Sequence, residues 1–285
     1  MFWYNGDLIK TNIIELAIDD PGLLYGATVF TTLRVYCQSL DRPLTNWKGH
    51  GDRLRSSIQF LNWQEPDWQK VRQGAEILLQ DFPVLRITIF SDGREWITGR
   101  SLPTDLTEKQ RHGVAASLVS GEEFHRFLPT HKTGNYLGAW LARTKAQHMT
   151  ASEAIFVDPN DNWLETSTGN LWGWQDGSWW TPPLETGILP GIMRSQLIDW
   201  LKNQNQPVME KPWTPEIIKT MEAIAYSNSI VQLIPIHTVF EERGVRSVDA
   251  IAASQRVERG QEKMNQLNYN PYHPAFEQLR KLFAD

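Results

Sequence analysis

The sequence contains one cysteine, no run of basic residues and no long apolar segment. A lone thiol, Cys37, cannot form an internal disulfide, and no segment approaches the roughly 18 apolar residues of a membrane-spanning helix. Residues 1–7 lack the basic region and apolar core of a secretory leader. With a net charge of −5 and scattered lysines and arginines, the chain has no electrostatic footprint for nucleic acid or an anionic membrane. We therefore expect a cytoplasmic protein that binds neither of them, and we predict no metal site.

Size and composition favour a two-domain globular protein. The chain has 285 residues, of which 41% are apolar and 21% charged, whereas one domain commonly spans roughly 100–200 residues. Helix and strand patterns are mixed along the chain, which predicts an α+β protein. Polar and turn residues gather before position 131, so we predict domains at 1–115 and 131–285 and a linker at 116–130.

The first half predicts alternating strands and helices. Asn5-Gly6 between short apolar runs is typical of a hairpin turn, and β-branched and aromatic residues favour a long strand at 24–36. The other predicted elements are helices at 45–61 and 68–79 and a hairpin of strands 84–90 and 95–98. Alternation along the long strand places on one face Thr28, Phe30, Thr32 and Arg34.

The second half predicts short strands followed by helices. Asp, Asn and Gly separate short β-rich runs, which is typical of an antiparallel meander. Pro190-Gly191 and Thr214-Pro215 are typical helix starts. The predicted strands are 114–119, 153–158, 163–165, 170–174, 178–181, 223–227 and 231–239, and the last predicted helix is 274–283.

One lysine, Lys132, lies at a break in this pattern. It ends a polar, proline-containing loop, and downstream Tyr136, Leu137, Trp140 and Leu141 recur at the spacing of an amphipathic helix. A partly desolvated lysine near the positive end of a helix dipole loses its proton more readily, and its free amine can form a Schiff base. The alternative is an ordinary surface lysine, since a buried unpaired charge is costly.

Four other segments offer groups that such a lysine would need. Gly191 opens a helix whose free backbone N–H groups suit a phosphate, and Ser227-Asn228 ends a strand with further donors. Arg53 could donate charge-assisted hydrogen bonds to the same anion. Glu165 follows an apolar pair, and a buried carboxylate there could keep a pyridine nitrogen protonated. The alternatives are an ordinary helix start, a turn, a surface charge and a solvated strand end.

Six motifs follow one another along the chain. They are Tyr-Gly-x-x-Val-Phe at 25–30, His-x-x-Arg-Leu at 50–54, Lys-Thr-Gly-Asn-Tyr-Leu at 132–137, Glu-x-x-x-x-Asn-Leu at 165–171, Gly-Ile-Leu-Pro-Gly-Ile-x-Arg at 187–194 and Ser-Asn-Ser at 227–229. In this order they resemble the class IV aminotransferase family, the fold-type IV pyridoxal-phosphate enzymes. The resemblance implies a homodimer with a small N-terminal α/β domain and a larger C-terminal domain with a barrel-like sheet. It also places pyridoxal 5'-phosphate in the cleft between the domains.

The resemblance assigns roles to individual residues. Lys132 would hold the cofactor as an aldimine and act as the catalytic base, Glu165 would pair with the pyridine nitrogen, and Tyr136 would lie near the phenolic oxygen. The residues around the phosphate would be Arg53, Gly191, Ile192, Met193, Ser227 and Asn228. The family usually has threonine where Met193 stands, which leaves backbone donors at that position.

The motifs leave the reaction open. The segment 29–35 and the Ser-Asn-Ser-Ile run at 227–230 resemble 4-amino-4-deoxychorismate lyases, which form 4-aminobenzoate and pyruvate in folate biosynthesis. The segment 132–136 is similar to branched-chain aminotransferases, and a D-amino-acid transaminase stays open as well. We predict the lyase, with Tyr25, Phe30 and Thr32 as substrate contacts and Thr32 as a catalytic proton relay. For Phe30 and Thr32 the alternative role is packing within the sheet. For the whole chain the remote alternative is a non-catalytic binding protein on this scaffold.

Overall fold

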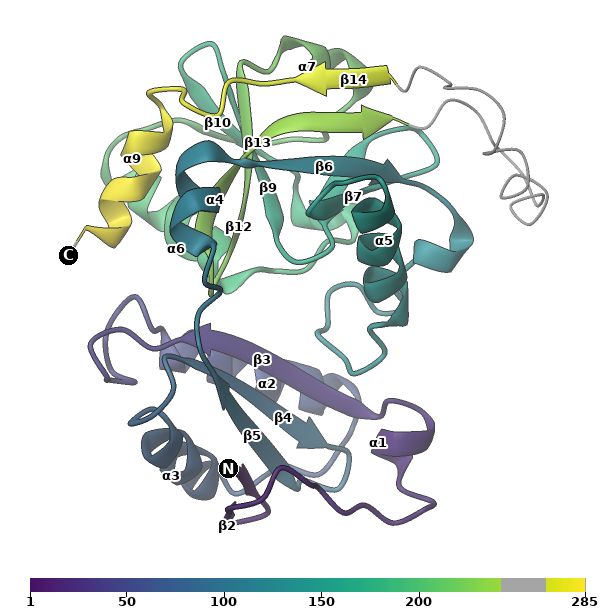
Figure 1. Cartoon of the computed structure of the whole chain (residues 1–285), viewed down its shortest axis with the longest axis vertical. Coiled ribbons are helices and arrows are strands. Elements are labelled where there is room, and N and C mark those ends of the chain that lie inside the picture. The colour runs from purple at the N-terminus through teal and green to yellow at the C-terminus, as the bar shows by residue number, and fades with distance from the viewer. Residues whose placement is uncertain (242–264, 285) are drawn as a thin grey trace.

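Two β-sheets with their helices divide the chain into a lower and an upper part (Figure 1). The computed structural model describes residues 1–241 and 265–284. The chain passes from the lower to the upper part at 101–105, between strand β5 (Glu95–Arg100) and helix α4 (Leu106–His112). Within the described ranges, every helix is too short or too polar to cross a bilayer.

The lower part is a five-stranded antiparallel sheet with helices on one face. The strand order is β2-β1-β5-β4-β3, which leaves β3 at an edge. The other bounds are β1 (Phe2–Tyr4), β2 (Asp7–Ile9), β3 (Thr28–Arg34), β4 (Val84–Phe90), α1 (Pro21–Leu24), α2 (Trp47–Phe60) and α3 (Trp68–Leu78). Leu33, Ile58, Leu78 and Ile87 are fully buried between α2, α3 and the sheet. The opposite face is therefore left for the upper part.

Local signals in the lower part are confirmed at most positions. Asn5 and Gly6 have positive φ values of 48° and 90°, as the predicted turn between β1 and β2 requires. The predicted strand at 24–36 is wrong at its start, because Pro21 opens helix α1 and the Asp20 side chain accepts a hydrogen bond from Gly22 N. The strand begins only at Thr28.

The upper part is a nine-stranded sheet, six strands of which close into a barrel. Its order is β11-β10-β9-β12-β13-β6-β7-β8, with β14 beside β13, and β8 also pairs with β9. That last pairing joins Glu165 to Asn170 and closes the ring β9-β12-β13-β6-β7-β8. The strands are β6 (Val114–Val119), β7 (Glu153–Val157), β8 (Trp163–Thr166), β9 (Asn170–Gln175), β10 (Ser178–Thr181), β11 (Val208–Glu210), β12 (Ala223–Asn228), β13 (Gln232–Glu241) and β14 (Asn265–Asn268). The predicted meander from β7 to β10 is confirmed.

Helices cover the outside of this barrel. They are α5 (Leu137–His148), α6 (Ile192–Asn203), α7 (Pro215–Thr220) and α9 (Phe276–Arg280), with 3₁₀ turns at Glu122–Phe124, Leu184–Thr186 and Lys281–Phe283. The Thr214 side chain caps α7, as its position before Pro215 predicts. Trp172 and Trp179 pack with α6 and α9 in one fully buried cluster, so part of the tryptophan content fills this core. The predicted α+β fold class with a barrel-like second sheet is confirmed.

The boundary between the parts differs from the predicted linker at 116–130. Strand β6 (Val114–Val119) is hydrogen-bonded to β13 on one side and β7 on the other. Its first residues therefore belong to the barrel, and α4 before it is a helix that the polar sequence of 102–111 did not indicate. We propose instead that the chain divides at 101–105.

Helix α5 occurs where the sequence predicts it but presents the opposite face to the core. Leu137 and Trp140 are each 61% exposed, whereas Ala139, Ala142 and Ala146 are buried. The alanines allow the helix to approach β7 closely, so the bulky residues are left on the surface.

Candidate active site

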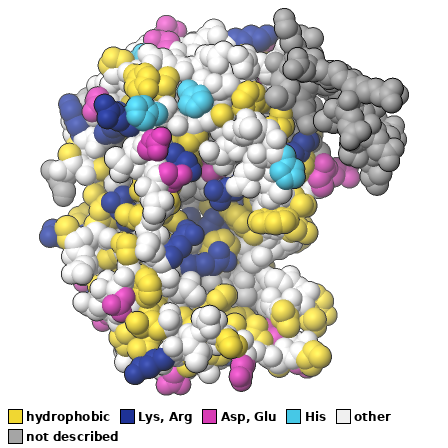
Figure 2. Space-filling view, in the orientation of Figure 1, with side chains coloured by type: hydrophobic (Ala, Val, Ile, Leu, Met, Phe, Trp, Pro, Cys, Tyr) yellow, Lys and Arg dark blue, Asp and Glu magenta, His cyan; other side chains and the backbone are white. Residues whose placement is uncertain are grey.

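A cavity of about 270 Å³ lies between the two parts of the molecule. Its walls come from β3, β4 and β5 below, from the loop around Lys132, and from the barrel strands and the start of α6 above. Figure 2 shows lysine and arginine side chains gathered in a hollow at this level.

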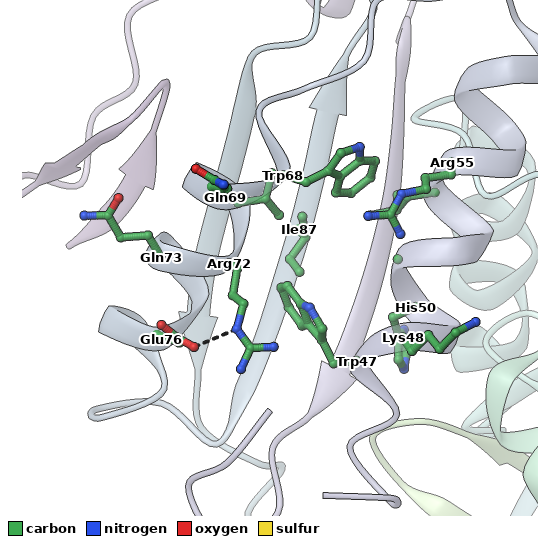
Figure 3. A pocket seen from close by; sticks show the side chains of 13 residues that line it. Trp47, Lys48, His50, Arg55, Trp68, Gln69, Arg72, Gln73, Glu76 and Ile87 are labelled. Carbon is green, nitrogen blue, oxygen red and sulfur yellow. Dashed lines mark hydrogen bonds and ion pairs between the residues drawn. The ribbon is translucent and has the colours of Figure 1, made fainter. Parts of the chain in front are cut away.

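A second cavity, of about 480 Å³, lies between α2 and α3 on the outer face of the first sheet (Figure 3). Its charged side chains are paired either within the lining or with neighbouring surface residues: Arg72 contacts Glu76 and Asp41, and Lys48 contacts Asp52. Paired surface charges of this kind do not form a site for a charged ligand. We therefore place the candidate active site in the cavity between the two parts.

Most of the predicted site residues meet in that cavity although they are far apart in the sequence. Those that line it are Phe30, Thr32, Arg53, Lys132, Tyr136, Glu165, Gly191, Ile192, Met193, Ser227 and Asn228. Tyr25 does not, because it ends α1 and is 74% exposed. Its predicted role as a substrate contact has no support from the cavity of its own chain and stays a prediction.

Lys132 is held against the edge of β3. Phe30 N donates to the Lys132 carbonyl over 2.8 Å, and Gly134 N donates to the Thr28 carbonyl over 2.7 Å. These contacts extend β3 by one short paired segment, so the position of Lys132 is fixed by the sheet. Its Nζ lies 3.1 Å from the Tyr136 hydroxyl and 4.8 Å from the centroid of the Phe30 ring.

The environment of Lys132 disfavours its charged form. Burial in the cavity lowers the pKa of the ammonium well below its usual value, and the nearby cations Arg53 and Arg126 lower it further. The sequence analysis predicts that a helix dipole contributes to the lowered pKa of Lys132. However, α5 begins only at Leu137, and desolvation is the leading cause of the lowered pKa. A neutral amine at this position is the nucleophile that a carbonyl cofactor requires.

Glu165 also lines the cavity and is buried. Its Oε1 accepts from Arg126 at 2.6 Å, and its Oε2 accepts from Leu189 N at 3.2 Å. Burial raises the pKa of this carboxyl, and Arg126 is the main group opposing the rise. No local pattern indicates Arg126, because its contact with Glu165 joins a loop to a barrel strand 39 residues away.

The start of α6 and Arg53 form an anion-binding end of the cavity. No side chain caps the helix at Gly191, so its first backbone N–H groups remain available. A Cβ at Gly191 would collide with Asn170 Oδ1, which explains the glycine. Arg53 Nε is buried without a hydrogen-bond partner among the described residues, and burial lowers the pKa of this guanidinium to about 10. It therefore stays charged at neutral pH, and a phosphate fits these donors.

Three predicted phosphate residues contribute in different ways. The Met193 side chain is buried in the core beside Leu197, so only its backbone can serve an anion. Ser227 Oγ accepts from Trp172 Nε1 at 2.9 Å, which leaves its own proton to donate. The Asn228 side chain accepts from two backbone N–H groups in the turn that follows and donates to the Thr168 carbonyl. Asn228 therefore shapes the wall of the cavity.

Residues 28–239 match the model of a protein family described as amino-transferase class IV. The chain belongs to the class IV aminotransferases. Aminodeoxychorismate lyase of Vibrio harveyi is 23% identical over 252 residues, which cover 83% of this chain and 90% of that protein. The crystal structure of Escherichia coli branched-chain amino acid aminotransferase has 22% identity and a TM-score of 0.73, covering 84% and 86% of the two chains. A hypothetical aminotransferase from Mycobacterium tuberculosis in its PLP-bound form has 20% identity and a TM-score of 0.74, covering 90% and 97%.

Class IV aminotransferases are pyridoxal-phosphate enzymes, so this class IV aminotransferase is an enzyme with that cofactor. The predicted family, cofactor and enzyme class are thus confirmed, and the binding-protein alternative is set aside. The residues present fit the cofactor: a buried lysine amine with a lowered pKa, a buried carboxylate and an anion-binding end lie around one cavity. Bound there, pyridoxal phosphate supplies an electron sink for the substrate carbon that bears the amine.

Proposed function

We propose that this class IV aminotransferase is a 4-amino-4-deoxychorismate lyase, which forms 4-aminobenzoate and pyruvate in folate biosynthesis. The observation that carries the proposal is the excess of positive charge around the cavity. Glu165 is the one carboxylate that lines it among the described residues, and the cations that line it are Arg53, Arg86, Arg100, Arg126, Lys132 and Arg143. The cofactor phosphate and Glu165 account for Arg53 and Arg126. The remaining arginines suit a substrate with two carboxylates, such as aminodeoxychorismate.

Arg86 is the arginine best placed for a substrate carboxylate. It lies opposite Thr32 in the β3–β4 ladder, and its guanidinium carbon is 3.6 Å from the centroid of the Phe30 ring. Within the described ranges no carboxylate forms an ion pair with it. Stacking on Phe30 orients the guanidinium while its charge remains available for substrate.

Lys132 Nζ is the base in this proposal. It takes the proton from the ring carbon that bears the substrate amine. Departure of enolpyruvate from the neighbouring carbon then makes the ring aromatic, and the enolpyruvate becomes pyruvate. The Tyr136 hydroxyl, 3.1 Å from Nζ, holds the amine in place between proton transfers. Thr32 stays a predicted relay from the same wall, although no hydrogen bond joins it to Lys132 in the described structure.

A branched-chain or D-amino-acid transaminase is the second candidate. Apolar side chains also line the cavity, among them Phe156, Leu189 and Ile230, and they could contact an aliphatic substrate. The amino acid has one carboxylate and would leave part of the arginine excess without a partner, whereas the co-substrate 2-oxoglutarate has two, so the assay of both reactions decides between the candidates.

The test offers the holoenzyme aminodeoxychorismate and, separately, a branched-chain amino acid with 2-oxoglutarate. We expect aminobenzoate fluorescence and no exchange of oxo acids; oxo-acid exchange without aminobenzoate would refute the lyase. Arg86→Met should raise KM for aminodeoxychorismate by about tenfold or more, since a charge-assisted hydrogen bond contributes roughly 1.5–3 kcal/mol. Arg34→Met is the matched control, because Arg34 stacks on Tyr36 and does not line the cavity.

We also propose a homodimer, which the apolar surface beside the cavity supports. Gly26 lies against Gly134 and Asn135, so the end of α1 adjoins the start of α5. The exposed apolar residues on these two helices and at the end of α1 are Leu23, Leu24, Tyr25, Leu137 and Trp140. Patches of this kind mark interfaces more often than free surface. Trp140→Asp should give a monomer in sedimentation, whereas Tyr272→Asp, also at an exposed aromatic, should not.

We also propose a cytoplasmic location for this protein, because the thiol of Cys37 is free and exposed.

A further inference from the structure

The guanidinium of Arg53 is held by one neutral side chain, which a second neutral side chain supports in turn. Arg53 donates from a terminal nitrogen to Thr31 Oγ1 over 2.7 Å, and Thr31 Oγ1 lies 2.6 Å from His50 Nδ1. Thr31 and His50 are both fully buried. We call this chain of contacts, His50–Thr31–Arg53, the arginine relay.

The direction of the hydrogen bonds in the arginine relay follows from the donors available. A guanidinium can only donate, so Thr31 Oγ1 accepts from Arg53, and its own proton is free to be donated to His50 Nδ1, 2.6 Å away. In the proposed arginine relay Nδ1 accepts this proton, so the ring is neutral and carries its own proton on Nε2. Burial, followed by the charges of Arg53 and Lys132, lowers the pKa of His50 well below its usual value, which agrees with a neutral ring.

Neutral partners have a consequence that a carboxylate would not have. A carboxylate would hold the guanidinium but cancel much of its electric field. The Thr31 hydroxyl, supported by the His50 imidazole, holds it without cancelling its positive charge. None of the described carboxylates pairs with Arg53, and its Nε has no partner. The guanidinium therefore has a fixed hydrogen-bond partner but no compensating carboxylate, and it lines the same cavity as the start of α6.

We propose that Thr31 and His50 are positioning residues which fix the Arg53 guanidinium for the cofactor phosphate without neutralising it. The proposal rests on pyridoxal phosphate occupying the cavity, and it gives a role to two residues that face away from the cavity. Since Phe30 and Thr32 line the cavity and Thr31 alternates with them, β3 would serve the substrate on one face and the phosphate on the other.

The test compares the dissociation constants of pyridoxal phosphate and of pyridoxal, which lacks the phosphate. Thr31→Val keeps the shape of the side chain and removes the hydroxyl. We expect it to weaken pyridoxal phosphate binding about tenfold and pyridoxal binding less than about twofold. Thr31→Ser keeps the hydroxyl and should restore the wild-type ratio. Thr181→Val removes a buried hydroxyl on β10 that donates to the Leu171 carbonyl of β9. This control should lower stability and leave the ratio of the two dissociation constants unchanged.

The outcomes separate the arginine relay from the cofactor assignment. If wild-type protein binds neither compound, the cofactor assignment fails. If Thr31→Val binds pyridoxal phosphate as the wild type does, or loses both compounds equally, the arginine relay is refuted. Should Thr31→Val not fold, Thr31→Ala takes its place in the same comparison.

A second measurement concerns His50 directly. In ¹⁵N-labelled holoenzyme we expect the chemical shift of an unprotonated Nδ1 at neutral pH, and a protonated Nδ1 would overturn the proposal. His50→Asn, whose amide oxygen can accept from Thr31, should bind pyridoxal phosphate more tightly than His50→Leu. Equal affinities would also count against the arginine relay.

Discussion

The ion pair between Arg126 and Glu165 offers a stability test whose size and pH dependence follow from the structure. The two side chains are 10% and 8% exposed and their closest atoms are 2.6 Å apart. Without Arg126, the carboxylate keeps only the Leu189 N–H at 3.2 Å and a longer contact to Asn170. Breaking a buried pair by removing one partner costs about 3–5 kcal/mol. For a chain of this size we expect Arg126→Met to lower the melting temperature of the cofactor-free protein by on the order of 10 °C.

The loss should depend on pH with a sign set by Glu165. Burial already raises the pKa of this carboxyl above its usual value of 4.5, and removal of Arg126 takes away the main opposing cause. Well below pH 4.5 the Glu165 carboxyl is protonated in both the folded and the unfolded chain, so Arg126→Met loses little stability. As the pH rises above 4.5 the unfolded chain releases the proton first, and folded stability falls until the buried carboxyl also ionises. The deficit should therefore grow from pH 5 to pH 8.

The assay is thermal unfolding followed by circular dichroism at both pH values. Arg100→Met is the matched control, because Arg100 lines the same cavity without an ion pair among the described residues. Arg126→Lys should retain part of the stability, and Glu165→Gln combined with Arg126→Met should recover much of the loss. A deficit that is equal at pH 5 and pH 8, or no larger than that of Arg100→Met, would refute the reasoning.

Two other substitutions test the cavity. Lys132→Met should abolish turnover yet raise the melting temperature of the cofactor-free protein by a few degrees, or about 1–2 kcal/mol. Because the unfolded lysine binds a proton up to its usual pKa of 10.5 and the folded one does not, this gain should shrink as the pH approaches 10. Lys10→Met, at an exposed lysine, should change neither property, and a destabilised Lys132→Met would contradict the assignment. Gly191→Ala, whose Cβ would collide with Asn170, should weaken pyridoxal phosphate binding about tenfold in a fluorescence titration; unchanged affinity would show that the helix start does not contact the phosphate.

Local sequence signals predicted much of the fold, because a few neighbouring residues determine a turn or a cap. Asn46 caps α2 by accepting from Gly49 N, and Thr214 before Pro215 opens α7. Asn5-Gly6 forms its turn with both φ values positive. The stability of each cap or turn depends on residues within a few positions of it, so it can be predicted without knowledge of the rest of the molecule.

Three placements near the site differ from what spacing along the chain suggests. The apolar stripe of α5 predicts that Leu137 and Trp140 are buried, but the neighbouring strand is close enough to admit only alanines. The role of Arg126 depends on a loop that meets a barrel strand far away in the sequence. Tyr25 belongs to a motif, yet α1 turns it outward. Spacing along the chain could not determine any of these three placements.

Strand β3 explains why so many of the predicted site residues nevertheless converge. Its edge binds the backbone of Lys132, one face carries Phe30 and Thr32 to the cavity, and the other carries Thr31 to the α2 side chains that include Arg53. A strand of period two presents these groups in fixed directions, so a short motif determines where lysine, substrate and phosphate groups lie relative to one another. A one-residue slip of β3 against β4 would exchange the two faces and remove Arg53 and the substrate wall together. Every pyridoxal-phosphate enzyme of this family needs a lysine such as Lys132, so the proposed choice of reaction depends on the wall that β3 and β4 build, in which Arg86 lies opposite Thr32 and stacks on Phe30.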